Sequence, residues 1–327
     1  PERNLDYDPL TSKEFRECSE FISDYLLETP QIPWPLLSER LKCTVFVKHE
    51  NHLPTGSFKV RGGIWFVGQL AKNQSSGNII VATRGNHGQS IAYAAQQFNK
   101  SVTAVVPYGN NPEKNKSMKA LGANLIEYGA DFDEALSYAR ELGRRENLEF
   151  VPSFHPLLAQ GVGTYAFEFL NEIRDLDTVY VPVGLGSGIV GFIAAKEALG
   201  MNVEVVGVDS EKADAYASSW ENKRLISTQS ADTIADGLAV RIPFQSVLDF
   251  LSGRVSRIIR VSEQSILEAV KITVSDTHNL VEPAGAASLA GLIKERKKNV
   301  GKRVGVVLSG GNIDKKTLCQ SLNYMEL

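Results

Sequence analysis

The chain has 327 residues, 43% hydrophobic and 22% charged, which suggests one large or two ordinary domains with enough apolar surface for their own cores. Its 35 basic and 38 acidic residues give a net charge of −3, and its apolar runs are too short to span a bilayer, so we expect neither a nucleic-acid nor a membrane partner. Cys18, Cys43 and Cys319 form no CxxC motif and fit neither a disulfide framework nor a zinc site, so we expect buried thiols in the cytoplasm.

The first predicted elements in chain order are a helix and a proline-rich loop. Residues 12–28, SKEFRECSEFISDYLLE, place apolar side chains at helical spacing. Residues 29–35, TPQIPWP, are predicted to be loop because proline cannot donate a backbone hydrogen bond. No apolar secretory segment precedes these elements, so we expect no signal peptide.

From residue 78 onward, buried strands alternate with amphipathic helices. The predicted strands are NIIVAT, SVTAVVP, ANLIEYG, DTVYVPV, VEVVGVD and KRVGVVLS, and the predicted helices are GQSIAYAAQQF, PEKNKSMKALG, DFDEALSYARELGRREN and IVGFIAAKEALG. This alternation implies parallel sheets covered by helices on both faces. We therefore predict a two-lobed, doubly wound α/β fold. Residues 78–153 would form a small domain, and residues 1–77 plus 154–327 a large one.

Three glycine-rich turns follow predicted strands. They are TRGNHGQ at Thr83–Gln89, GLGSG at Gly184–Gly188 and SGGN at Ser309–Asn312. Ligands of open parallel sheets bind beyond the carboxyl ends of the strands, where such turns lie. Glycine lets the backbone approach a ligand, and a following helix adds its positive N-terminal end, so GLGSG is the best candidate for a phosphate site.

The second turn also admits a different interpretation. Gly186, Gly188 and Gly191 spell GxGxxG, and Asp209 follows at the end of the next predicted strand, where a ribose-binding acid would lie. These residues alone would indicate a nicotinamide-dependent oxidoreductase. That interpretation leaves the segments TGSFK and TRGNHGQ without a role. A third class, a non-catalytic anion-binding α/β protein, would use only the three turns.

Six ordered segments resemble a known family: HENHLPTGSFKVRGG, ATRGNHGQSIAYAA, VPVGLGSGIVG, TIADGLAV, EPAGAASLAG and LSGGNID. They are similar to the signatures of the fold-type II pyridoxal-phosphate enzymes, and closest to the serine/threonine dehydratase and serine racemase branch. The resemblance runs from about Thr29 to Asp314. It implies a tryptophan synthase β-like fold, pyridoxal 5′-phosphate as cofactor and an amino acid as substrate. We also expect a homodimer.

The resemblance assigns the covalent and ring contacts of the cofactor. Lys59 would be the catalytic residue and would form a Schiff base with the cofactor aldehyde, while Phe58 would flank the ring. Asn86 would bond the 3′-oxygen and Ser309 would face the pyridine nitrogen. The full cofactor-binding set that the resemblance implies is Phe58, Lys59, Asn86, Gly184, Leu185, Gly186, Ser187, Gly188, Gly237, Glu282 and Ser309.

The remaining implied roles concern the phosphate, the ring border and the substrate. The turn Gly184–Gly188 would hold the phosphate, and Gly237 and Glu282 would border the ring. The substrate carboxylate would be bound by the loop after the first sheet strand of the small domain, which contains Thr83, Arg84, Gly85, Asn86 and His87.

The chemistry of these residue types fits the implied reaction. A Schiff-base lysine must lose its proton before it attacks, and burial beside apolar Phe58 and Val60 would lower its pKa. Arg61 would add to this effect only if it folds back toward the amine. The freed Lys59 can then take the α-proton. A neutral hydroxyl such as Ser309 stabilises the carbanion less than a carboxylate partner would, which suits β-elimination of water to a 2-oxo acid and ammonia.

The sequence departs from the family at Arg84, where the racemases carry a serine base. Arginine cannot act as a base near neutral pH, so two-base racemisation is disfavoured. Arg84 would instead be a loop residue on the surface or an extra cation for the substrate, which would favour a substituted substrate of the 3-hydroxyaspartate or phenylserine type. The sequence therefore predicts an ammonia-lyase for threonine, serine or such a substrate, with a racemase as the alternative.

Two further family features are not expected in this chain. Some relatives bind a divalent cation with two acids and a carbonyl after the strand that ends here at Asp209. Asp209 and Ala213 fit two of these positions, but the third falls on Ala215, so we expect no metal site. The chain also ends about thirteen residues after LSGGNID, so we expect no regulatory domain and no control by isoleucine.

Overall fold

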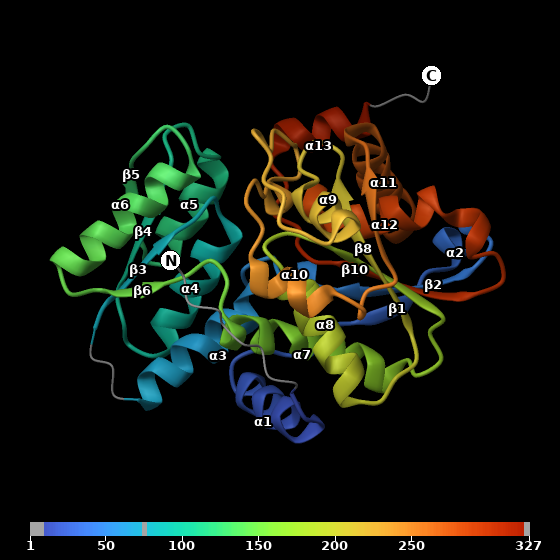
Figure 1. Ribbon diagram of the computed structural model, residues 1–327, viewed down its shortest axis with the longest axis horizontal. Coiled ribbons are helices and arrows are strands. Elements are labelled where there is room, and N and C mark those ends of the chain that lie inside the picture. The colour runs from blue at the N-terminus through green and yellow to red at the C-terminus, as the bar shows by residue number, and fades with distance from the viewer. Residues whose placement is uncertain (1–9, 74–76, 324–327) are drawn as a thin grey trace.

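The computed structural model describes residues 10–73 and 77–323, and it contains two open sheets (Figure 1). The doubly wound α/β architecture predicted from the strand–helix alternation is confirmed. The strands are β1 (Gln31–Pro33), β2 (Thr44–His49), β3 (Ile79–Ala82), β4 (Val102–Val106), β5 (Asn124–Glu127), β6 (Glu149–Val151), β7 (Thr178–Pro182), β8 (Glu204–Ser210), β9 (Arg257–Val261) and β10 (Arg303–Leu308).

The larger sheet has the strand order β1-β2-β10-β7-β8-β9 and the smaller one the order β5-β4-β3-β6. All neighbouring strands are parallel except β1, which pairs antiparallel with β2 at the edge of the larger sheet. Figure 1 shows the smaller sheet on the left and the larger one on the right. The smaller sheet uses only residues 79–151, and we propose the segment 78–153 as the small domain.

Helices cover both faces of each sheet, because the strands carry apolar side chains toward both faces. Val179 and Val181 of β7 pack against α7 and α8, whereas Tyr180 packs with α12 on the opposite face. The helices are α1 (Ser12–Ser23), α2 (Pro35–Leu41), α3 (Lys59–Lys72), α4 (Asn86–Gln97), α5 (Pro112–Ala120), α6 (Phe132–Arg145), α7 (Pro156–Glu172), α8 (Ser187–Ala198), α9 (Ala215–Asn222), α10 (Gln245–Leu251), α11 (Glu263–Thr277), α12 (Pro283–Lys294) and α13 (Lys315–Leu322).

The proline-rich segment is more ordered than the sequence predicted. Instead of a loop, residues 31–33 form the edge strand β1, and Pro35 begins α2. An edge strand leaves one side of its backbone unpaired, so the missing N–H of Pro33 is tolerated. Proline at the first position of a helix lacks an N–H that would have no helical partner anyway. The prediction of loop was therefore wrong here.

Helices α7 and α8 pack closely through glycines. A Cβ atom built on Gly191 would lie 2.7 Å from the carbonyl oxygen of Ala159 and 2.7 Å from the Cα of Gly163. Any larger side chain at Gly191 would push the two helices apart. The last glycine of the GxGxxG pattern is thus used for helix packing.

A group of four buried ionic side chains lies beneath the start of α3. The Arg61 guanidinium donates to both carboxylate oxygens of Glu50, at 2.7 and 3.0 Å, and to both of Glu168, at 2.6 and 2.8 Å. Lys48 donates to Glu168 at 2.7 Å. Two cations and two carboxylates leave this group neutral, so the charges compensate one another in a place that water does not reach.

Arg61 therefore does not fold back toward Lys59, so the condition under which it would lower the pKa of that lysine is not met. The guanidinium is committed to Glu50 and Glu168, and burial alone lowers the pKa of Lys59. Although burial opposes ionisation of Glu168, Arg61 and Lys48 more than offset it, so the pKa of this carboxyl is lowered.

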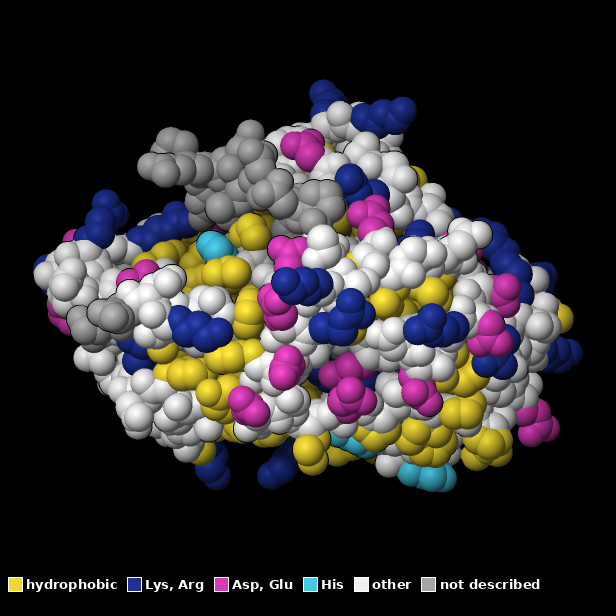
Figure 2. Space-filling model, turned by 90° about the horizontal axis from the view of Figure 1, so that it is seen from below, with side chains coloured by type: hydrophobic (Ala, Val, Ile, Leu, Met, Phe, Trp, Pro, Cys, Tyr) yellow, Lys and Arg dark blue, Asp and Glu magenta, His cyan; other side chains and the backbone are white. Residues whose placement is uncertain are grey.

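Among the described residues, no helix is both long and apolar enough to cross a bilayer. Basic and acidic side chains are interspersed over the face of the molecule in Figure 2. Cys18 and Cys43 are buried free thiols, as predicted, but Cys319 is exposed. It lies on the terminal helix α13, of which only Ser321 is buried.

We predict that Arg61→Met lowers the free energy of unfolding by about 3–5 kcal/mol, because it leaves Glu50 and Glu168 with a single buried cation. Urea unfolding at pH 7.5 would measure this. Arg254→Met is the matched control, since Arg254 pairs with Glu197 on the surface and its loss should cost less than about 1 kcal/mol. Equal costs in the two variants would contradict a stabilising role of the buried group.

Candidate active site

One cavity of about 540 Å³ lies beyond the carboxyl ends of β3, β7 and β10, between the two sheets. Every residue to which the family resemblance assigned a site role lines it. These residues are Phe58, Lys59, Thr83, Arg84, Gly85, Asn86, His87, Gly184, Leu185, Gly186, Ser187, Gly188, Gly237, Glu282 and Ser309. The structure thus brings together residues as far apart in the chain as Phe58 and Ser309, while their individual roles remain predictions.

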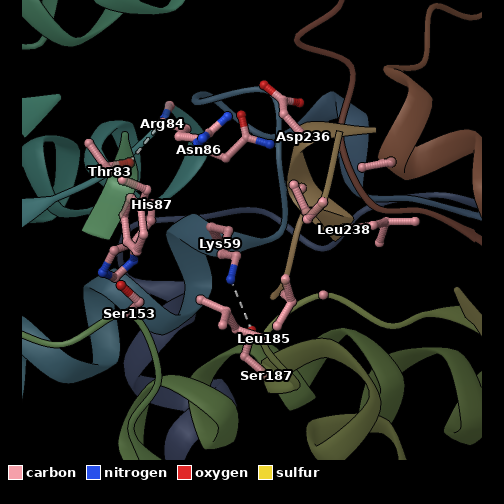
Figure 3. A pocket seen from close by; sticks show the side chains of 18 of the residues that line it. Lys59, Thr83, Arg84, Asn86, His87, Ser153, Leu185, Ser187, Asp236 and Leu238 are labelled. Atoms are coloured by element: carbon pink, nitrogen blue, oxygen red, sulfur yellow. Dashed lines mark hydrogen bonds between the residues drawn. The ribbon is translucent and has the colours of Figure 1, made fainter. Parts of the chain in front are cut away.

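Lys59 is the first residue of α3, and its amine points into the cavity (Figure 3). Its Nζ donates a hydrogen bond to Oγ of Ser187 at 3.2 Å. Burial lowers the pKa of Lys59 to about 8, because removal from water disfavours the ammonium form. A sizeable fraction of this amine is therefore unprotonated and nucleophilic near neutral pH.

The turn Gly184–Gly188 joins β7 to α8 beside this amine. Gly186 has a φ of 113°, which favours glycine, and it precedes α8 without a side-chain cap. The first N–H groups of α8 therefore have no capping side chain and are free to bind an anion. Leu185 is not among the described residues with positive φ, so its side chain costs no backbone strain.

The loop before α4 is held by Thr83. Its buried Oγ1 accepts hydrogen bonds from the backbone N–H groups of Gly85 and Gly88, both at 3.0 Å. Arg84 follows and is exposed at the cavity wall. His87 lies near Ser153 in Figure 3, and burial together with the charge of Lys59 lowers the pKa of His87 to about 3, so its ring is neutral.

Asn86 and Glu282 meet at the wall between the two lobes. The Asn86 amide donates to Oε1 of Glu282 at 2.5 Å and accepts from the Asn312 amide at 2.9 Å. Ser309 directly follows β10, and its carbonyl accepts from the backbone N–H of Phe58 at 3.0 Å, which ties the end of this strand to the start of α3. Gly237 packs against Ala284, next to Glu282.

Lys114, which no sequence pattern predicted as a site residue, reaches the same wall from α5. Its Nζ donates to Asp236 at 2.8 Å and to Glu282 at 3.3 Å. A charged residue in the first turn of a polar helix normally faces solvent, so the segment PEKNK gave no sign of it. Asp236 could have been suspected, because it immediately precedes Gly237 in the TIADGLAV segment.

The rim of the cavity also carries charges that the sequence did not single out. Arg241, after the Asp236–Leu238 turn, lies 3.0 Å from Asp133 and 4.0 Å from Asp131 at the start of α6. These pairs bridge the two lobes at the mouth of the cavity. Their side chains are about half exposed, so they contribute little to stability.

The acidic residues at the end of β8 and after it, Asp209 and Asp214, have partners outside the cavity. The buried Asp209 carboxylate accepts from the backbone N–H groups of Ser210 and Ala217, and Asp209 does not line the cavity. It is thus not placed as a ribose-binding acid there. Asp214 forms an ion pair with Arg260 at 2.8 Å. Within the described part of the chain, no three His, Cys, Asp or Glu side chains are grouped to hold a metal.

The residues of the cavity fit pyridoxal phosphate. A lysine with a lowered pKa suits its aldehyde, and the uncapped N-terminus of α8 suits its phosphate. Oγ of Ser187 lies 3.2 Å from the Lys59 amine, so subsites for the aldehyde and the phosphate would be adjacent. The hydroxyl of Ser309 and the amide of Asn86 would be available as polar partners for the ring substituents.

Comparison with known proteins gives the same picture. Residues 22–310 match the family described as pyridoxal-phosphate dependent enzyme. The chain is 33% identical to a mitochondrial threonine dehydratase of Schizosaccharomyces pombe, over 90% of this chain and 50% of the relative. It is 29% identical to the L-threo-3-hydroxyaspartate ammonia-lyase of Saccharomyces cerevisiae, over 92% of both chains.

The fold has a solved counterpart in the processed form of threonine deaminase isoform 2 from Solanum lycopersicum. The TM-score is 0.88 at 27% identity, covering 97% of this chain and 95% of the tomato chain. The chain spans about half the length of the first curated relatives that it matches.

We predict that Lys59 in protein freed of carbonyl ligands with hydroxylamine is acetylated with a midpoint near pH 8, because its pKa is lowered to about 8. At pH 7.5 roughly one quarter of this amine would be unprotonated, against about 0.1% for an ordinary lysine. Trace labelling with acetic anhydride between pH 6 and 11, read by mass spectrometry, measures this, with the exposed Lys13 as internal reference. A midpoint near pH 10 would show that the amine is not desolvated.

Proposed function

The chain belongs to the pyridoxal-phosphate-dependent enzyme family, and on that premise we propose that it eliminates water from a β-hydroxy amino acid such as threonine or serine, giving a 2-oxo acid and ammonia. The observation that carries this proposal is the desolvated amine of Lys59 beside the uncapped glycine turn before α8. Threonine dehydratases and ammonia-lyases among the relatives support the same reaction class.

We propose that Lys59 holds the cofactor covalently and that the N–H groups at the start of α8 bind its phosphate. When bound, pyridoxal phosphate supplies an aldehyde for amines and a ring that withdraws electrons from the substrate α-carbon. Asn86 would donate to the 3′-oxygen and Ser309 would face the ring nitrogen. Glu282 and Gly237 would border the ring, and Phe58 would lie along it.

The proton chemistry would fall to Lys59. A free lysine amine with a pKa of about 8 would suit both acceptance and release of a proton close to neutral pH. It would take the α-proton and return it to the β-hydroxyl, which would leave as water. The enamine product then tautomerises and is hydrolysed to the 2-oxo acid and ammonia.

The residues around Lys59 favour elimination over racemisation. A second base would have to reach the α-carbon from the loop before α4, where Arg84 stands in the place of the racemase serine. Arginine stays protonated in proteins. His87 in the same loop is neutral, but its Nε2 is buried away from solvent.

We propose that Arg84 selects substrates with a polar or acidic side chain. It is exposed at the cavity wall, and its guanidinium offers a fixed charge and several donors for a carboxylate. The L-threo-3-hydroxyaspartate ammonia-lyase of Saccharomyces cerevisiae, whose name gives a substrate with a second carboxylate, supports this idea.

The cytoplasm and a homodimer remain our proposals for location and assembly. The free cysteines, two of them buried, suit a reducing compartment. Light scattering coupled to size-exclusion chromatography would give the mass in solution, and a mass near one 35.8 kDa chain would contradict the dimer.

We predict that the parent protein absorbs in the near-visible through its bound cofactor. Lys59→Ala should fold but lose this absorbance and at least about three orders of magnitude of kcat for serine and threonine, because no other amine replaces the nucleophile and base. The absorbance, its loss on borohydride reduction and the release of 2-oxo acid would be measured for both proteins at equal concentration. A variant that retains chromophore and activity would sink the assignment.

A second prediction concerns Arg84→Ala. If Arg84 contacts the substrate, kcat/KM for 3-hydroxyaspartate should fall about ten- to a hundredfold, the cost of one charge-assisted contact, while that for serine changes less than about threefold. The constants would be determined for serine, threonine, 3-hydroxyaspartate and phenylserine in both proteins. Parallel changes across the four substrates would place Arg84 outside the substrate contact.

A further inference from the structure

Lys114 is the one described residue of α5 that joins the ion pairs at the cavity wall, and it comes from the smaller lobe. Its side chain is 8% exposed and passes over Gly85, where a built Cβ atom would lie 2.4 Å from Cδ of Lys114. A glycine at position 85 is therefore needed for the lysine to reach the wall. Asp236 and Glu282, its two acceptors, both belong to the larger lobe.

The hydrogen bonds around Asn86 determine which way its amide faces. The Asn312 amide nitrogen donates to the carbonyl of Thr55 at 2.8 Å and to Oδ1 of Asn86 at 2.9 Å. Asn86 must therefore direct Nδ2 toward Glu282, whose Oε1 accepts at 2.5 Å. One hydrogen of this Nδ2 is used by Glu282, and the second is left for a ligand in the cavity.

This arrangement requires Glu282 to be a carboxylate. Its two oxygens accept from two donors, Asn86 and Lys114, and a protonated carboxyl would turn a donor toward one of them. Burial raises the pKa of Glu282, and Lys114 opposes that rise. The other charged groups nearby are Asp236, which opposes ionisation of Glu282, and Asp314, which lies near Lys114. Lys114 is thus the cation that compensates a buried carboxylate.

We propose that Lys114 is a positioning residue: it holds Glu282 as a carboxylate and thereby fixes the Asn86 amide with its nitrogen toward the ligand, an inference that rests on the proposed function of the cavity. Lys114 and Asn86 belong to the smaller lobe, whereas Glu282 belongs to the larger one. The correct amide orientation is therefore available only when the two lobes are together, so the contact also couples lobe arrangement to binding.

The first test needs neither cofactor nor substrate. The thermal unfolding temperature of the apoprotein would be measured from pH 5.5 to 8 for the parent, Lys114→Met, Lys114→Arg and the double variant Lys114→Met/Glu282→Gln. In Lys114→Met, the pKa of Glu282 rises further above its unfolded value. A raised carboxyl pKa contributes stability at low pH that is lost as the pH rises through it.

The unfolding temperature of Lys114→Met should therefore fall relative to that of the double variant by about 3 °C or more between pH 5.5 and 8. The same trend should be smaller in the parent and in Lys114→Arg, where a cation opposes the rise of the Glu282 pKa. Curves for Lys114→Met and the double variant that run parallel would overturn the proposal. Should Lys114→Met fail to fold, Lys114→Gln would replace it with the same expected trend.

The second test uses the loaded enzyme. The acid limb of kcat/KM should move to higher pH by at least about one unit in Lys114→Met and return toward the parent in Lys114→Arg. In the double variant, which cannot titrate at position 282, that shift should be absent and only the limb due to Lys59 should remain. A loss of activity that is equal at every pH would mean that Lys114 acts only as packing, and would overturn the proposal. Absence of lyase activity in the parent would instead defeat the proposed function and leave the thermal test valid.

Discussion

The position of Lys59 depends on the buried guanidinium of Arg61, two residues further along α3. All five of its N–H donors have acceptors, supplied by Glu50, Glu168 and Thr164. Because arginine cannot shed its proton, this charge must be compensated wherever it is buried. The start of α3 is therefore fixed to the segment after β2 and to α7. Arg61, whose charge is fully compensated, thus holds in place the helix start that carries the buried amine of Lys59.

The residues that line the cavity are divided between the two lobes. The larger lobe supplies the glycine turn, Ser309 and Glu282, and the smaller lobe supplies the loop from Thr83 to His87 and Lys114. Neither lobe alone carries a complete site. Ligands of open parallel sheets bind where strand ends meet, and here the strand ends of two sheets face one cavity. A ligand that contacts residues of both lobes would therefore require the lobes to lie close together.

Local chemistry made much of this site predictable. Lys59, Asn86 and the turn Gly184–Gly188 stand in short segments whose residue types led to their predicted roles, and all of them line one cavity. Lys114 was not predictable, because nothing in a polar helix start distinguishes a solvated lysine from one that crosses to another lobe. The prediction of loop at Pro33 was wrong because an edge strand tolerates proline. Whether a strand lies at the edge is a property of the whole sheet and cannot be read from the segment itself.

The sequence by itself determined the doubly wound class and much of the alternation of strands and helices, because periodicity and turn chemistry act over a few neighbouring residues. Its resemblance to a family also singled out Lys59 as the proposed reactive lysine. Only the tertiary structure decided which partners the charged side chains have. Arg61 turns to Glu50 and Glu168 and not to Lys59, Asp209 is turned away from the cavity, and Lys114 joins Glu282 across the lobes. Burial and pairing of charges depend on partners far apart in the chain, and such partners are fixed only when the lobes have packed.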